Sequence, residues 1–100
     1  MQVINVPNTA NLKCACTSWK DHWIRFNPNK LAAMLQVNCS AVGCSGKFEH
    51  GGLVRKTGDL TVYIVPLCAG CNSPENMGPY FIYEHVPLVQ ADPRSTCEPR

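Results

Sequence analysis

The chain lacks several features that would assign a function directly. Nine basic against seven acidic residues leave a net charge of only +2 over 100 residues, and no run of lysine or arginine appears. A dedicated nucleic-acid-binding domain usually gathers positive charge on one face, so the composition neither requires nor excludes such a partner. A glycine-rich phosphate loop and a Ser-His-Asp arrangement are also missing.

Long hydrophobic runs are absent as well. No window approaches the roughly 18 apolar residues of a membrane span, and the start "MQVINVPNTANLK" has neither the basic beginning nor the apolar run of a secretory signal. The sequence therefore predicts a cytoplasmic protein without a membrane partner. Thiols stay reduced in that compartment, so clustered cysteines indicate metal ligands before disulfides.

Cysteine is abundant, with seven copies. A chain of this size forms one domain whose hydrophobic core alone gives little stability, so a bound metal would contribute strongly. We expect a single zinc-stabilised domain over residues 1–100, with residues 91–100 as a flexible tail. That tail contains Cys97, for which the sequence indicates no role.

Two closely spaced cysteine pairs predict a zinc site. Cys39 and Cys44 form one pair, and Cys68 and Cys71 form the other. Pairs at this spacing suit tetrahedral zinc, because a tight turn lets both thiolates converge on one ion. The sequence therefore predicts one zinc ion bound by these four side chains. Disulfides and unpaired buried thiols remain the alternatives.

A third pair, Cys14 and Cys16, suggests a possible second metal site. His22 follows six residues later, and among the candidates for a fourth ligand His50 has the most plausible position, just before the predicted hairpin. Two zinc ions per chain are therefore possible. In the alternative interpretation both thiols are buried as small apolar groups and His22 lies on a helix surface.

Two short helices are predicted, over residues 19–26 and 29–36, and they should pack together as a helical cap. The first begins after Ser18, which can cap it, and has an aromatic stripe at helical spacing, facing the core. Its members are Trp19, Trp23 and Phe26. The second places three apolar side chains on one face, which we expect to be buried. They are Leu31, Met34 and Leu35.

The strands are predicted from alternating and β-branched stretches. Residues 1–6 should form a short edge strand, and residues 52–56 and 60–67 should form a β-hairpin in which Gly58 supplies a turn residue with positive φ. Beyond the last cysteine pair, "NSPENMGP" predicts a short helix and "YFIYEHVPLV" a third strand. The predicted fold class is therefore a small α+β zinc-binding domain built from a knuckle, a hairpin and a short helix.

The stretch from Cys39 to Asn72 resembles the treble-clef zinc fingers of the HNH type. That family has a cysteine pair, a strand ending in an aliphatic residue, a turn, a second strand and a second cysteine pair. The matching text here is "CSAVGC", "GGLV" and "YIVPLCAGCN". The resemblance covers about one third of the chain, and it implies a treble-clef arrangement around a structural zinc.

At the catalytic positions of that family, this chain has different residues. Leu53 stands where an HNH nuclease has its general-base histidine, Tyr63 where it has the central asparagine, and Asn72 where it has the last histidine. Phosphodiester hydrolysis needs a base and a divalent metal, and leucine supplies neither. His50 could replace the base only by reaching from the other face of the strand. The resemblance therefore does not imply nuclease activity.

These features predict a non-catalytic recognition module. Four thiolates saturate zinc and leave no position for water. Because the net charge is low, we expect a protein partner, with the chain acting as an adaptor or an inhibitor. The alternatives are a nucleic-acid-binding domain that uses Lys47, Arg55 and Lys56, or a degenerate HNH-like nuclease. The sequence does not indicate the oligomeric state.

Overall fold

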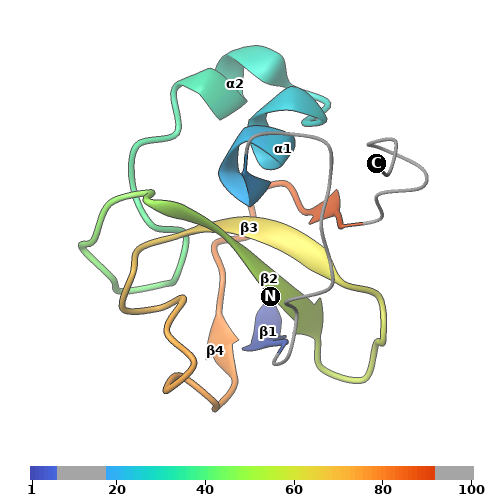
Figure 1. Ribbon diagram of the computed structural model, residues 1–100, viewed down its shortest axis with the longest axis vertical. Helices are drawn as coiled ribbons and strands as arrows, with labels where there is room; N and C mark the ends of the chain where they lie inside the picture. Colours follow the sequence, from blue (N-terminus) through green and yellow to red (C-terminus); the bar gives the residue numbers. More distant parts are fainter. Residues whose placement is uncertain (7–17, 92–100) are drawn as a thin grey trace.

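A computed structural model describes residues 1–6 and 18–91 of the chain. A five-stranded antiparallel sheet forms its centre, in the order β4-β1-β2-β3-β5 (Figure 1). The strands are β1 (Gln2–Asn5), β2 (His50–Lys56), β3 (Tyr63–Leu67), β4 (Tyr80–Phe81) and β5 (Val89–Gln90), and the helices are α1 (Trp19–Arg25) and α2 (Lys30–Met34). The described residues therefore form a small α+β structure, as predicted.

Strands β2 and β3 pair as an antiparallel hairpin, which confirms the predicted hairpin. Leu53 pairs with Ile64 in its register, and both side chains are buried. Gly58 has the expected positive φ, at 84°. The second strand begins at Tyr63 and thus later than predicted, because the Thr61 N–H donates to Asp59 Oδ1 at 2.9 Å and keeps this part of the chain in a turn.

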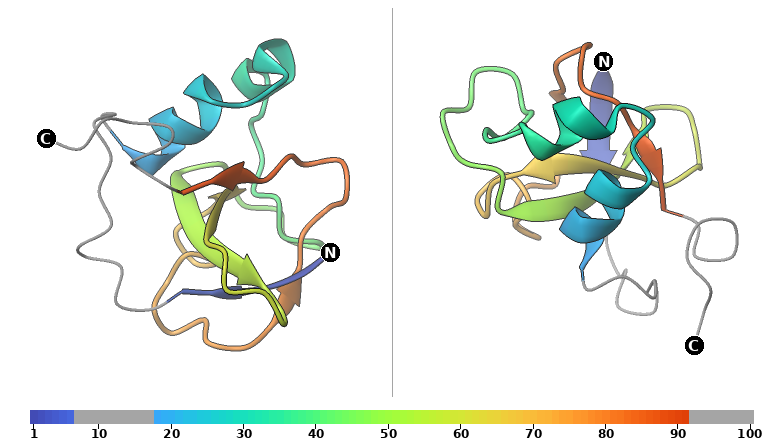
Figure 2. Two further views of the ribbon diagram at one scale, coloured as in Figure 1. Left: turned by 90° about the vertical axis from the view of Figure 1, so that its right-hand side faces the viewer. Right: turned by 90° about the horizontal axis from the view of Figure 1, so that it is seen from above.

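Helix α1 covers one side of the sheet, against β2 and β3 (Figure 2). Ser18 caps it as predicted, because its Oγ accepts the Asp21 N–H at 3.0 Å. Trp23 is 1% exposed, and its indole N–H donates to the Pro87 carbonyl at 3.0 Å. The approach of the helix to the sheet depends on Gly51, since a Cβ there would lie 2.4 Å from the Trp19 carbonyl carbon.

Helix α2 corrects one prediction. Asn29 caps it, and Ala33 is its buried residue. The three apolar side chains expected on a buried face are exposed instead, at 70% for Leu31, 72% for Met34 and 69% for Leu35. Helical spacing identifies an apolar face but not the element that covers it, and here the short helix contacts α1 through its alanine side.

The first strand and the last predicted strand both differ from the prediction. Strand β1 lies between β2 and β4, so it is an inner strand and not an edge strand. The expected strand over residues 80–89 is divided into β4 and β5, with buried Ile82 and Val86 between them. The intervening chain turns, since the Val86 N–H donates to the Tyr83 carbonyl at 3.1 Å.

The helix expected over residues 72–79 is absent from the structure, which has turns there. The Asn76 N–H donates to the Ser73 carbonyl at 2.9 Å, and the Glu75 N–H donates to Ser73 Oγ at 3.1 Å. These local bonds compete with a helical ladder, and Gly78 and Pro79 prevent its extension. The final helix implied by the treble-clef resemblance is therefore not present in the described residues.

One hydrophobic cluster joins α1, the sheet and the segments around it. Ala91, the first residue of the predicted tail, belongs to this cluster, and its N–H donates to the Val62 carbonyl at 2.9 Å. Residues 92–100 lie outside the described residues. Neither described helix is long and apolar enough to cross a membrane.

Candidate metal centre

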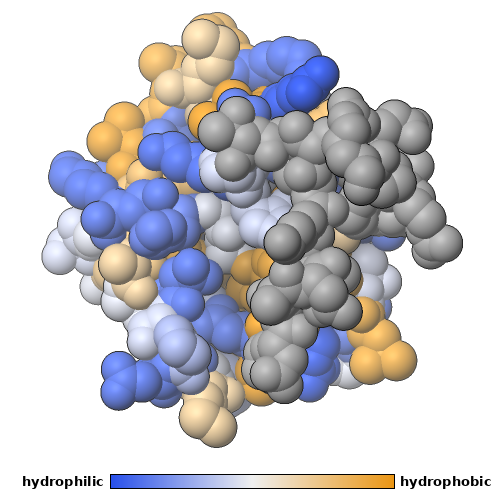
Figure 3. All heavy atoms as spheres, in the orientation of Figure 1, coloured by the Kyte–Doolittle hydropathy of each residue, from blue (hydrophilic) through white to orange (hydrophobic). Residues whose placement is uncertain are grey.

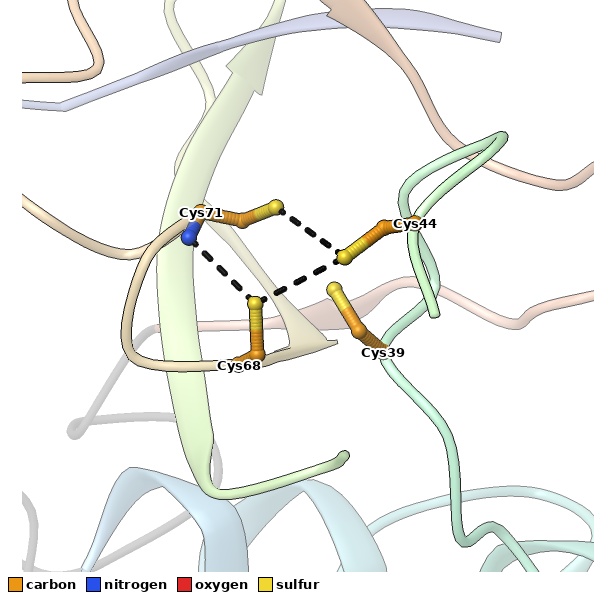
Figure 4. Close-up of side chains that lie close together, drawn as sticks. All are labelled: Cys39, Cys44, Cys68 and Cys71. Carbon is orange, nitrogen blue, oxygen red and sulfur yellow. Dashed lines mark hydrogen bonds between the residues drawn. The ribbon is translucent and has the colours of Figure 1, made fainter. Parts of the chain in front are cut away.

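Four cysteine side chains from two loops meet at one point, as Figure 4 shows. The Sγ atoms of Cys39, Cys44, Cys68 and Cys71 all lie within 4.8 Å of one another. The distance from Cys44 Sγ is 3.7 Å to Cys68 Sγ and 3.8 Å to Cys71 Sγ. A tetrahedral zinc ion with Zn–S bonds near 2.3 Å would place its sulfur ligands about 3.8 Å apart. The cluster therefore has the dimensions of a four-thiolate metal site.

The same distances are incompatible with disulfides in this structure. A disulfide brings two sulfur atoms to about 2.05 Å, and all four of these cysteines are free thiols. The disulfide alternative is therefore not supported at this cluster. The four residues could hold a metal ion, and thiolate ligands in this number suit zinc.

The first knuckle, residues 39–46, closes through its own backbone. The Cys39 N–H donates to the Gly46 carbonyl at 2.9 Å, and the Cys44 N–H donates to the Ala41 carbonyl at 3.1 Å. The Gly46 N–H also points at sulfur and lies 3.4 Å from Cys44 Sγ. Such N–H···S bonds orient a thiolate ligand before the metal arrives.

Two strands hold the first knuckle between them. The N–H and the hydroxyl of Ser40 both donate to the Pro66 carbonyl in β3, at 2.9 and 2.6 Å. On the other side the Val42 N–H donates to the Phe81 carbonyl in β4 at 2.8 Å, and the Tyr83 N–H donates to the Ser40 carbonyl at 3.1 Å. The knuckle therefore links segments that are far apart in the sequence.

The second knuckle, residues 68–72, follows directly from β3. The Cys71 N–H donates to Cys68 Sγ at 3.4 Å, and the Asn72 N–H donates to the Cys68 carbonyl at 3.0 Å. The side-chain amide of Asn5 in β1 donates to the Cys71 carbonyl at 2.9 Å. Both knuckles are thus anchored to the sheet, so a metal bound between them would connect β4, β1 and β3.

The close approach of the two knuckles requires a glycine that the sequence analysis did not single out. A Cβ at Gly46 would lie 2.8 Å from the Cys68 Cβ, 3.0 Å from the Cys68 Sγ and 3.4 Å from the Cys44 Sγ. Carbon atoms do not approach so closely without displacing one another. Gly46 is therefore part of the candidate site, and its position two residues after Cys44 was the available signal.

The protonation of the cluster is uneven. The Cys71 N–H lowers the pKa of the Cys68 thiol to about 7. Burial raises the pKa of the Cys39 and Cys71 thiols, and hydrogen bonding with the other thiols raises that of Cys71 further. Several thiolates cannot share a small volume without a compensating cation. Binding of a divalent metal would supply that charge and release protons.

The second metal site remains a prediction. Cys14 and Cys16 lie outside the described residues. His22 is fully buried in α1 and not on a helix surface as the alternative interpretation expected, whereas His50 is exposed at the start of β2. Within residues 1–6 and 18–91, the four-cysteine cluster is the only group of three or more His, Cys, Asp or Glu side chains close enough to share a metal.

The His22 ring is buried beside two aromatic side chains, and this burial affects its pKa. Its ring centroid lies 5.1 Å from that of Trp19 and 4.8 Å from that of Phe26. Burial lowers the pKa of His22, which a hydrogen bond with the Gln90 backbone partly offsets. The neutral ring is therefore favoured in the folded chain.

The three basic residues proposed for nucleic-acid binding do not share one surface. Lys47 precedes β2, whereas Arg55 and Lys56 lie near its far end. Successive residues of a strand point to opposite faces. Arg55 accordingly lines a cleft on one side, while the Lys56 ammonium lies 5.5 Å from the Tyr63 ring centre.

The cleft beside Arg55 has a volume of about 610 Å³ and is lined by residues that the HNH resemblance singled out. Leu53 and Asn72 both line it, but Tyr63 does not. The amide of Asn5, one of its polar groups, donates to two backbone carbonyls of the adjoining loop, at 2.9 and 3.1 Å, and accepts the Tyr80 hydroxyl. This side chain therefore serves the fold.

Comparison with known proteins adds no assignment. No protein-family model matches the chain, and no match was found among curated proteins or solved structures. The HNH likeness therefore remains a local resemblance of residues 39–72. What the described residues define is a small α+β structure with a cysteine cluster that could bind a metal ion.

Proposed function

We propose that this chain is a zinc-stabilised recognition module that binds another protein, as an adaptor or an inhibitor, and that it carries out no catalysis. The observation that carries the proposal is the convergence of four cysteine sulfurs within 4.8 Å. Four thiolates complete the coordination of zinc, so the ion would stabilise the fold and would not activate water. The activity of the module would then lie on its surface.

The side chains around the hairpin support a non-catalytic function. The position of the HNH general base holds Leu53, which is 8% exposed and paired with Ile64 in the sheet. His50 lies three residues earlier in β2, so the alternation of the strand directs it to the opposite face. This placement of His50 supports the proposal that it does not replace the histidine of the HNH pattern.

Catalysis is tested with the zinc-loaded chain in a plasmid-nicking assay with added Mg²⁺ or Mn²⁺. We expect no cleavage above the background of a metal-only control. Metal-dependent cleavage that disappears in a His50→Ala variant would contradict the proposal and would favour the degenerate nuclease. Cleavage that persists in that variant would indicate a contaminant and would be removed by further purification.

Protein binding is tested by cross-linking the tagged chain in its source cells. We expect a specific protein partner that is recovered with the wild-type chain and lost with a Cys68→Ser, Cys71→Ser double variant, since the surface depends on the metal centre. A partner that is a nucleic acid, with affinity falling steeply with salt and with substitution of Lys47, Arg55 or Lys56, would establish the alternative function.

A further inference from the structure

The exposed face of α2 and the residues after it form a concentrated apolar surface. Nine large apolar side chains are exposed in the described part of the chain, and four of them fall within residues 31–37. We call these four, Leu31, Met34, Leu35 and Val37, the α2 patch; their exposed fractions run from 59% to 72%. Figure 3 shows hydrophobic side chains gathered over α2 at the top of the molecule. Surface patches of this kind mark interaction sites more often than isolated apolar residues do.

The charged residues next to the α2 patch along the chain and across its β-bridge are basic. Residues 31–37 contain no charged side chain, and Lys30 stands at their beginning. Lys47 lies at the other end, because it pairs with Asn38 across an isolated β-bridge. From residue 22 to residue 48 the sequence has three basic residues and no Asp or Glu. The patch therefore has an apolar centre and a basic rim, the arrangement of many protein interfaces.

We infer that the α2 patch binds an acidic amphipathic helix of a partner protein. Leu31 and Leu35 form an i, i+4 ridge and Met34 lies at i+3, so the surface can interlock with the ridges of a second helix. Methionine adapts its shape to different partners. Asp or Glu beside the apolar residues of the partner would face Lys30 and Lys47. This inference rests on the proposed function and adds the surface and the chemistry of the partner.

Charge argues against a second copy of the chain as the occupant. A symmetric dimer through the α2 patch would place the same surface of both copies together. Lys30 and Lys47 would then approach the basic rim of the other copy, and residues 22–48 offer no carboxylate to offset the repulsion. The carboxylates of an acidic partner would instead be attracted to these two lysines.

The size of α2 argues against a membrane surface. The helix has five residues. Helices that lie in a membrane interface often run to about 20–30 residues and insert Trp or Phe together with Leu. The α2 patch is aliphatic and confined to a five-residue helix and the residues after it, so it lacks the aromatic anchors of such helices.

The inference is tested by selecting short random peptides from a display library on the zinc-loaded full chain. We expect enriched peptides with apolar residues at i, i+3 and i+4 and with neighbouring Asp or Glu. Fluorescence anisotropy should then show that Leu31→Ser with Leu35→Ser weakens binding about tenfold or more. Lys30→Glu with Lys47→Glu should also weaken it. Leu60→Ser is the matched control, because Leu60 is 88% exposed in the hairpin loop, away from α2.

The inference would be overturned by no enrichment, by enriched peptides without acidic residues, by binding that survives the double serine variant, or by self-association in sedimentation that the variant abolishes. Binding to vesicles with anionic lipid, without peptide binding, would point to a membrane instead and would also overturn it. Peptides that bind another surface in chemical-shift mapping would remove the α2 patch but leave the proposed function intact. The thermal melting of each variant shows that a loss of binding is not a loss of folding.

Discussion

The cysteine end and the helical end of this molecule use their side chains in opposite ways. At the cysteine end the four sulfurs point inward and converge within 4.8 Å, and the surrounding backbone groups hydrogen-bond to them or to the sheet. At the helical end the large apolar side chains of α2 point outward, with Met34 72% exposed. The first region could hold a metal ion that would stabilise the fold, whereas the second leaves large apolar side chains on the surface.

The difference shows how a small domain can separate stability from recognition. The sheet and α1 bury a cluster that includes Trp23, Val54 and Ile64, and the knuckles are loops that reach this cluster through Cys39 and Ala41. A metal can hold such loops because its binding free energy becomes folding free energy. We therefore expect changes at the cysteine end to alter stability and changes at α2 to alter binding.

Loss of the metal should have the largest effect. Structural zinc contributes on the order of 10 kcal/mol in small domains, which is comparable to the whole stability of a domain. A Cys39→Ser, Cys71→Ser double variant, or treatment of the wild type with a strong chelator, should therefore abolish cooperative thermal unfolding. Circular dichroism melts measure this. An unchanged melting temperature in both cases would show that the cysteine end does not hold the fold.

The packing of the two knuckles gives a smaller, site-specific effect. Gly46→Ala should weaken zinc binding by about 10- to 100-fold, because the new methyl group would collide with Cys68 and overpacking costs about 1–3 kcal/mol. Gly70→Ala in the second knuckle is the control, since a Cβ there meets no atom within 4 Å. Competition with a chromogenic chelator measures both affinities. Equal affinities for the two variants would contradict the close approach at Gly46.

The histidine in α1 should make stability depend on pH. Burial lowers the pKa of His22 below its ordinary value of 6.5, so the unfolded chain binds this proton more readily than the folded chain. Stability should therefore be fully present above about pH 6.5 and should fall as the pH decreases further, by at most about 1.4 kcal/mol per pH unit.

Urea unfolding between pH 7.5 and pH 6, with excess zinc, measures this dependence. His22→Gln should flatten the curve, because it removes the buried group that titrates. A slope that persists in the His22→Gln variant would assign the dependence to the thiol ligands instead of the histidine.

The smallest effect on stability is expected at the α2 patch. Leu35→Ser should change the free energy of unfolding by less than about 0.5 kcal/mol, because the side chain is already 69% exposed. Ala33→Leu on the same helix should destabilise by about 1–3 kcal/mol, since Ala33 is 1% exposed. Urea unfolding compares the two. A large loss in Leu35→Ser would mean that the patch is covered within the folded chain.

The sequence was informative where short-range chemistry decides the structure. The spacing of Cys68 and Cys71, the capping by Ser18 and the positive φ of Gly58 all follow from local rules, and the structure agrees with each. The pairing of the two knuckles was predictable for the same reason, because each pair forms half of a tetrahedral site.

The features that the sequence did not predict depend on contacts between distant segments. The inner position of β1 follows from its pairing with β4, which lies more than 70 residues away and carries no pattern of its own. The exposure of Leu31 follows from which side of α2 meets α1, and helical spacing is the same in either case. The need for a glycine at position 46 appears only when the second knuckle is placed against the first.

Native mass spectrometry of the chain, purified without chelator, tests the central claim most directly. The account predicts at least one zinc ion per folded chain, retained under native conditions, released on denaturation and absent from a Cys39→Ser, Cys71→Ser variant. Two ions would add the site that involves Cys14 and Cys16. A metal-free chain whose mass is lower by about two hydrogens for each disulfide would contradict the account.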